Sequence, residues 1–141
     1  MLKMKLSDHS KQRLQATFTE WGVDELDYMG PMYEYLINGF EPGSFFTAVL
    51  ANNFMDAVRS SHPANTIPAL KKLSGWITAH MPEQAWGGYD EVKAWLALAD
   101  HERRAILEEC RLIYTTKQEV MLILKDMPVI HTDDFLRMEN C

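Results

Sequence analysis

The chain has 141 residues, 47% of them apolar, and a formal net charge of −6. This length is that of one domain, and the apolar content is sufficient for a hydrophobic core and too high for a disordered chain. The acidic excess is spread along the chain and no segment is basic, which argues against a nucleic-acid partner.

The cysteine content and the N-terminal residues bear on the compartment. Cys110 and Cys141 make no disulfide framework. Residues 1–11 contain lysines, but no apolar segment of a secretory signal follows them. No apolar run approaches the length that crosses a bilayer. We therefore expect a soluble protein of a reducing compartment, without a membrane partner.

The first elements expected along the chain are two helices. Residues 7–21 repeat apolar side chains every three or four positions, and Ser7 is suited to the N-cap. Residues 31–38 are expected to form the second helix, with Pro31 in its first turn.

A third helix is expected over residues 44–58, with Ser44 as its N-cap. Its apolar side chains form a broad stripe, made of Phe46, Val49, Leu50, Phe54, Ala57 and Val58. Asn52 and Asn53 stand side by side in its middle, where asparagine is a poor helix former. The pair is either a packing detail or a sign of something to be bound.

The next helix is expected to start at about residue 65 or 66, because Pro68 is tolerated only in a first turn. After the loop PEQAWGGYD, Asp90 is expected to cap a short helix and Asp100 another.

Thr116 and Glu119 have the spacing of a capping box, so residues 101–125 are expected to form two helices. The chain after Pro128 has no sustained period and is expected to be a loose tail. Strand alternation is absent. The sequence therefore predicts an all-α, compact bundle of about six to seven short helices in one domain, residues 1–141.

The asparagine pair is the first candidate site. An unpaired buried amide costs about 1–3 kcal/mol, so a buried asparagine should be hydrogen-bonded. One interpretation is a structural bond to a neighbouring backbone group or helix end, or solvation on the outer face. The other is that Asn52, Asn53 and Asp56 line a pocket for a polar ligand.

The loop tryptophan is the second candidate site. Trp86 is followed by Gly87, Gly88 and Tyr89, and the paired glycines permit close backbone approach. The indole either folds back onto the core or serves as a stacking platform or interface anchor. Trp21, Trp76 and Trp95 recur with apolar residues at helical spacing and are expected in the core.

Catalytic and metal-binding patterns are missing. The histidines have no metal-ligand spacing, and no nucleophile motif is present. Cys110 is expected on a core face as inert packing. We expect no catalytic residue, no metal and no cofactor, and hence not an enzyme.

Two basic pairs, Lys71-Lys72 and Arg103-Arg104, complete the candidates. Each is interpreted either as a solvated helix face or as the positive group of a binding site, and we include Arg103 and Arg104 among the candidate binding residues.

Residues 35–98 resemble a group of small, uncharacterised phage and prophage proteins. A short helix leads into Asn38-Gly39 and Pro42-Gly43, and "FFTAVLANNFMDAV" follows. A more polar helix, Trp86-Gly87 and "EVKAW" come after it. Residues 1–30, a helix and connector, and residues 99–141, a helical extension with the tail, lie outside the resemblance.

The resemblance implies a phage-encoded accessory protein of the bacterial cytoplasm and assigns no site residues. We expect a non-enzymatic counter-defence inhibitor and homo-oligomer. It would sequester a nucleotide-derived immune signal or bind a host defence protein. The alternatives are a phage assembly or morphogenesis helper, and a small enzyme without a recognisable motif.

Overall fold

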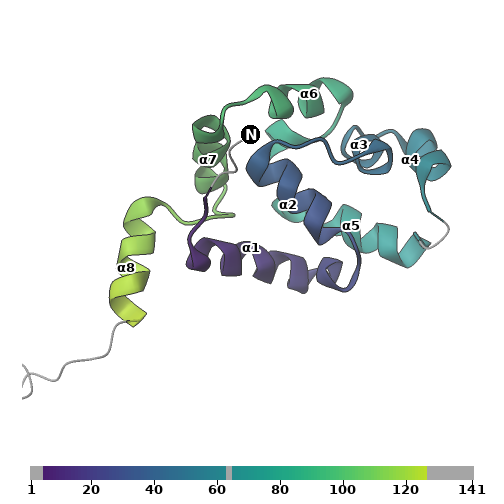
Figure 1. Cartoon of the computed structure of the whole chain (residues 1–141). Coiled ribbons are helices and arrows are strands. Elements are labelled where there is room, and N and C mark those ends of the chain that lie inside the picture. The colour runs from purple at the N-terminus through teal and green to yellow at the C-terminus, as the bar shows by residue number, and fades with distance from the viewer. Residues whose placement is uncertain (1–4, 63–64, 127–141) are drawn as a thin grey trace, which may run out of the picture.

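The computed structural model describes residues 5–62 and 65–126 of the chain. These residues form eight α-helices, two short 3₁₀ helices and no strand, which confirms the predicted all-α class (Figure 1). In chain order the elements are α1 (Asp8–Glu20), η1 (Val23–Glu25), α2 (Met29–Asn38), α3 (Ser44–Leu50), α4 (Phe54–Ser60), α5 (Ile67–His80), η2 (Glu83–Ala85), α6 (Tyr89–Ala97), α7 (Asp100–Glu109) and α8 (Thr116–Asp126).

Two predicted helix starts are confirmed. The Ser7 hydroxyl accepts a hydrogen bond from the Ser10 backbone N–H at 3.2 Å and caps α1. Thr66 caps α5 in the same way, which places Pro68 in the first turn, where its missing N–H costs no helical bond.

Three other predicted N-caps are wrong by one or two positions. Ser44, Asp90 and Asp100 lie inside the first turns, and the caps are Gly43, Gly88 and Ala99. At the start of α7 a side-chain acceptor at the cap is unnecessary, because the Glu102 carboxylate accepts from the Ala99 backbone N–H at 2.9 Å.

The capping box before α8 is shifted by one residue. Thr115 and Gln118 exchange the two reciprocal bonds, at 2.9 and 3.2 Å, in place of Thr116 and Glu119. The predicted division of residues 101–125 into two helices is confirmed. The loose tail predicted after Pro128 lies outside the described residues.

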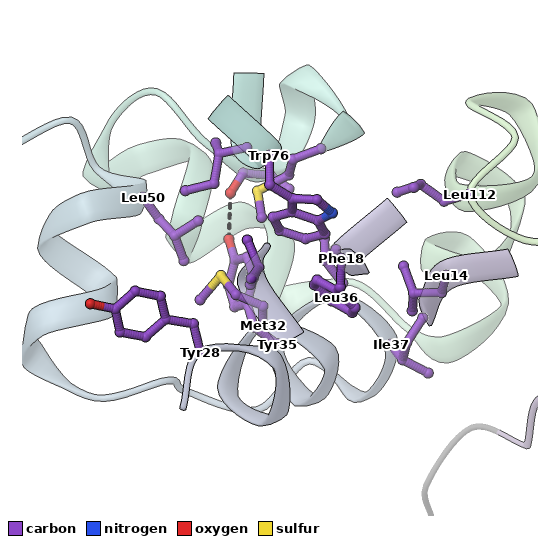
Figure 2. Packing of buried hydrophobic residues seen from close by; sticks show 14 of the residues in the cluster. Leu14, Phe18, Tyr28, Met32, Tyr35, Leu36, Ile37, Leu50, Trp76 and Leu112 are labelled. Carbon is purple, nitrogen blue, oxygen red and sulfur yellow. Dashed lines mark hydrogen bonds between the residues drawn. The ribbon is translucent and has the colours of Figure 1, made fainter. Parts of the chain in front are cut away.

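The core gathers around α2, and Figure 2 shows Trp76 of α5 beside it. Trp76 and Trp95 of α6 are both fully buried. Phe18 of α1 stacks on Trp76 with ring centroids 4.6 Å apart. The Tyr35 hydroxyl donates to the Ala85 carbonyl at 2.6 Å, and the Trp95 indole N–H donates to the Tyr35 carbonyl at 3.1 Å. Burial raises the pKa of Tyr35. These polar bonds allow large aromatic rings to be buried without unpaired groups.

Cys110 is not a core residue, contrary to the prediction. It is the C-cap of α7 and is exposed. Position 110 continues the apolar period of α7, but the helix has ended there and the chain turns, so the side chain leaves the buried face. Trp21, also expected in the core, is only partly buried at the edge of the core cluster.

Helix α8 projects from the rest of the molecule (Figure 1). It contacts α1 and contains no buried residue. Its large apolar side chains, Val120, Met121, Ile123 and Leu124, are 51–62% exposed. Across the described part of the chain, no helix combines the length and apolar character needed to cross a membrane.

Candidate functional site

The asparagine pair divides the predicted helix over residues 44–58 into α3 and α4. Asn52 has φ 59° and follows the last turn of α3. The Asn53 backbone N–H donates to the Ala48 carbonyl at 2.8 Å, and that of Asn52 donates to the Val49 carbonyl at 3.1 Å. These two bonds are the Schellman motif that ends a helix, and asparagine tolerates its left-handed position. The single-helix prediction is therefore wrong.

Asn53 also starts the next helix. Its side-chain oxygen accepts from the Asp56 backbone N–H at 3.1 Å and caps α4. The pair thus closes one helix and opens the next, and the structural interpretation of the asparagines holds.

The structure brings Asn53, Asp56 and Tyr89 together. The Asn53 amide donates to the Asp56 carboxylate at 2.9 Å and to the Tyr89 hydroxyl at 3.0 Å, and that hydroxyl donates to the same carboxylate at 3.2 Å. Arg59 adds an ion pair to Asp56 at 2.8 Å. This cluster ties the start of α4 to the start of α6, 33 residues further along the chain.

The loop before α6 is fixed to the end of α3. The Gly87 backbone N–H donates to the Leu50 carbonyl at 2.7 Å, with Gly87 at φ 120°. Gly88 then caps α6. A Cβ at Gly87 would meet no atom within 4 Å, so it is the positive φ, and not close packing, that favours glycine there.

Trp86 packs onto the core cluster and is partly buried. Its indole nitrogen is buried and has no hydrogen-bond partner within the described residues. The loop tryptophan is mainly a core-packing residue and is not a fully exposed platform.

An apolar groove lies next to the asparagine pair. Phe54, Ala57 and Val58 of α4 face Ile67 and Leu70 of α5 across it, and its volume is about 430 Å³. We call it the α4–α5 groove; the rest of its lining is Ala48, Val49, Asn52, Asn53, Lys71 and Ser74.

The apolar side chains at this groove are unusually exposed. Phe54 and Ile67 are 72% and 75% exposed, Val58 is 49% exposed, and the neighbouring Met55 is 75% exposed. Phe54 and Val58 belong to the apolar stripe predicted for residues 44–58, but the break at Asn52 divides that helix and leaves these two side chains on the surface. The asparagine pair was the signal for this groove, although the sequence did not show which side chains it would expose.

A second hollow of about 310 Å³ lies on the other side of the Asp56 cluster. Its charged lining consists of Glu41, Asp56 and Arg59. Since Arg59 is already paired with Asp56, this hollow offers no excess of positive charge to an anion.

The predicted basic pair does not belong to this site. Arg103 is 3% exposed, and its guanidinium donates to the carbonyls of Ile37 and Leu98 and to the Asp100 carboxylate. It joins the end of α2 to the α6–α7 connection, so its interpretation as part of a solvated face is wrong. Arg104 donates to Glu108 at 3.0 Å and lies 3.7 Å from Glu119.

In residues 5–62 and 65–126 no three His, Cys, Asp or Glu side chains lie together as metal ligands. What the arrangement offers is an apolar surface with an amide and lysine rim, supported by a hydrogen-bonded helix junction.

Comparison of the chain with protein families, with curated proteins and with solved structures gives no match.

Proposed function

We propose that this chain is a non-enzymatic binding protein that holds a polypeptide partner in the α4–α5 groove. The observation that carries the proposal is the exposure of Phe54, Val58 and Ile67 around one concave surface. Exposed apolar patches of this kind mark interaction sites on soluble proteins, because their burial is favourable only when a partner covers them.

The structure of the groove suits an anchor for a protein. Fully burying a Phe or Ile side chain contributes about 1.5–3 kcal/mol, so a few such residues can dominate an interface. The Schellman motif and the Asn53 cap hold α3 and α4 at a fixed angle, which lowers the entropic cost of binding. An apolar helix face of the partner matches a groove between two helices.

Of the two targets expected from the sequence, this groove favours the host defence protein over the nucleotide-derived signal. The polar groups of the Asn53–Asp56–Tyr89 cluster are bonded to one another, and Asp56 is an anion that would repel a phosphate. Both residues of the predicted basic pair are engaged elsewhere. In the phage context implied by the resemblance, the protein would act in the bacterial cytoplasm by covering a surface of a host protein.

The test is co-purification from phage-infected bacteria with the wild-type chain and with Phe54→Asp and Ile67→Asp. Both side chains are largely exposed, so we expect folded variants that lose the captured polypeptide, with affinity at least about tenfold weaker. Val120→Asp on α8 is the matched control, an exposed apolar residue outside the groove. A partner retained equally by the groove variants would contradict the proposal.

A second candidate function, the phage assembly helper, is supported by the outward apolar face of α8. In that case the same experiment gives the opposite pattern. Val120→Asp would lose the structural partner, and Phe54→Asp would retain it.

A further inference from the structure

Another hollow lies away from the α4–α5 groove. It has a volume of about 560 Å³ and lies between α1, the end of α5 and the connection between α7 and α8. Its charged and aromatic lining residues are His9, Arg13, Glu20, His80, Arg111 and Tyr114. None of the candidate site residues from the sequence is among them.

The charge of this hollow is opposite to that of the chain. Arg13 and Arg111 supply two positive charges, and Glu20 supplies one negative charge, so the lining is +1 with neutral histidines, in a chain of net charge −6. The Glu20 carboxylate is bound by the His80 ring at 3.2 Å. On an acidic protein, a concave surface with two arginines is the place where an anion would concentrate.

Arg13 is positioned by two contacts. Its Nε–H donates to the Arg111 carbonyl, and its guanidinium carbon lies 5.1 Å from the centroid of the Tyr114 ring. The terminal nitrogens of Arg13 remain available to a ligand, because no hydrogen-bond acceptor in residues 5–62 and 65–126 pairs with them. The same is true of the Arg111 guanidinium. Two arginines from segments 98 residues apart, each with guanidinium nitrogens that no acceptor in the described residues pairs with, therefore line one hollow.

Arg111 occupies a backbone position that favours glycine. It has φ 64° and follows α7, where the Leu112 N–H donates to the Leu107 carbonyl at 3.0 Å and the Arg111 N–H to the Glu108 carbonyl at 3.1 Å. This is again a Schellman motif, whose left-handed residue is usually glycine. The end of the helix does not need the arginine side chain, and its presence there carries backbone strain.

We propose that this hollow binds a small phosphate-bearing molecule, with phosphate oxygens on the guanidinium groups of Arg13 and Arg111. Arginine forks match phosphate oxygens in geometry and charge. The volume lies within the range of small-ligand sites and exceeds what a single phosphate fills, so an organic phosphate of nucleotide size fits it. The inference goes beyond the proposed function, because it uses a different surface and a different class of ligand.

The experiment is calorimetric titration of the full chain with AMP, ADP-ribose and a cyclic dinucleotide, with adenosine as the phosphate-free control. At least one phosphate compound is expected to bind with a Kd below about 1 mM and adenosine to bind at least about tenfold more weakly. Absence of binding by all three phosphate compounds, or equal binding of adenosine, overturns the proposal.

Arg111→Gly separates ligand binding from folding. Glycine suits the left-handed position, so the variant is expected to melt at the same or a higher temperature while phosphate binding weakens at least about tenfold. Arg59→Gln, which removes an exposed arginine outside this hollow, should bind like the wild type. Unchanged affinity in Arg111→Gly overturns the assignment. Binding to Phe54→Asp should persist, so failure here and failure of the α4–α5 groove are distinguishable.

Discussion

At the scale of single residues, three helices end at a residue with a left-handed backbone, and the residue differs at each end. Gly39 ends α2, Asn52 ends α3 and Arg111 ends α7. Glycine has no Cβ to strain, asparagine tolerates the conformation, and arginine does so at a cost of about 1–2 kcal/mol. Gly39 is further required because a Cβ would lie 2.5 Å from the buried Arg103 guanidinium.

Asn53 provides the prediction at this scale. Asn53→Ala removes the acceptor that caps α4 and the amide that bonds Asp56 and Tyr89. We expect the free energy of unfolding to fall by about 1–2 kcal/mol with the helix content retained, because the loss of an N-cap has this magnitude. Urea denaturation followed by circular dichroism measures it.

Asn53→Ser is the control for that substitution, since serine keeps a capping oxygen and loses only the amide bonds. It should recover most of the lost stability. If both variants are as stable as the wild type, the cap does not stabilise the junction.

At the scale of elements, α8 is attached through its polar side. The Glu119 carboxylate accepts from the hydroxyls of Ser7 and Ser10, at 2.6 and 2.5 Å, and His9 pairs with Asp126 at 3.0 Å. The apolar side of α8 is exposed. This reverses the usual arrangement of an amphipathic helix on a protein surface, so ionised groups and not apolar burial determine the attachment.

The pKa of Glu119 leads to a prediction for this attachment. Burial raises the pKa of Glu119, but the hydrogen bonds from Ser10 and Ser7 and the charges of Arg104 and His9 lower it more. The pKa of Glu119 in the folded protein is therefore below the usual 4.5. A lowered folded-state pKa stabilises the docked helix above pH 4.5, and this contribution is lost as pH falls through the folded value. Hydrogen-exchange protection of the α8 amides should therefore decrease in acid.

Glu119→Gln should lose the same protection already near neutral pH, because the charge is absent throughout. Glu109→Gln changes an exposed carboxylate at the end of α7 and serves as the control. Protection of α8 that is equal in wild type and Glu119→Gln would mean that the carboxylate does not hold the helix.

At the scale of the whole molecule, two exposed apolar surfaces lie on different helices, the α4–α5 groove and the outer face of α8. The homo-oligomer expected from the sequence stays a prediction, and the α8 face is the surface best suited to it. A twofold axis would place the apolar face of α8 against the same face of a second copy, so each face would cover the other.

Light scattering coupled to size exclusion tests this prediction. We expect a mass above the 16.3 kDa of one chain for the wild type and a shift toward the monomer for Val120→Asp. Phe54→Asp should keep the wild-type mass. A wild-type chain that remains monomeric at high concentration would exclude the oligomer.

The sequence by itself determined the helical class and most helix positions. Apolar periodicity, the caps Ser7 and Thr66 and the position of Pro68 depend on contacts within three or four residues, which are readable along the chain. Even the asparagine pair was recognisable as an anomaly. A bond from this pair to a helix end was one of the predicted alternatives, but the division of residues 44–58 into two helices was not predicted.

Only the tertiary structure decided which side chains are buried, exposed or brought together. Periodicity predicts a face for each helix but not what covers it, so Phe54 and Val58 belong to an apolar stripe and are nevertheless exposed. Arg103, interpreted as part of a solvated helix face or of a binding site, is buried. The meeting of Arg13 with Arg111 depends on how α1 packs beside the end of α7. Contacts between distant segments arise from packing of whole elements, and no local pattern encodes them.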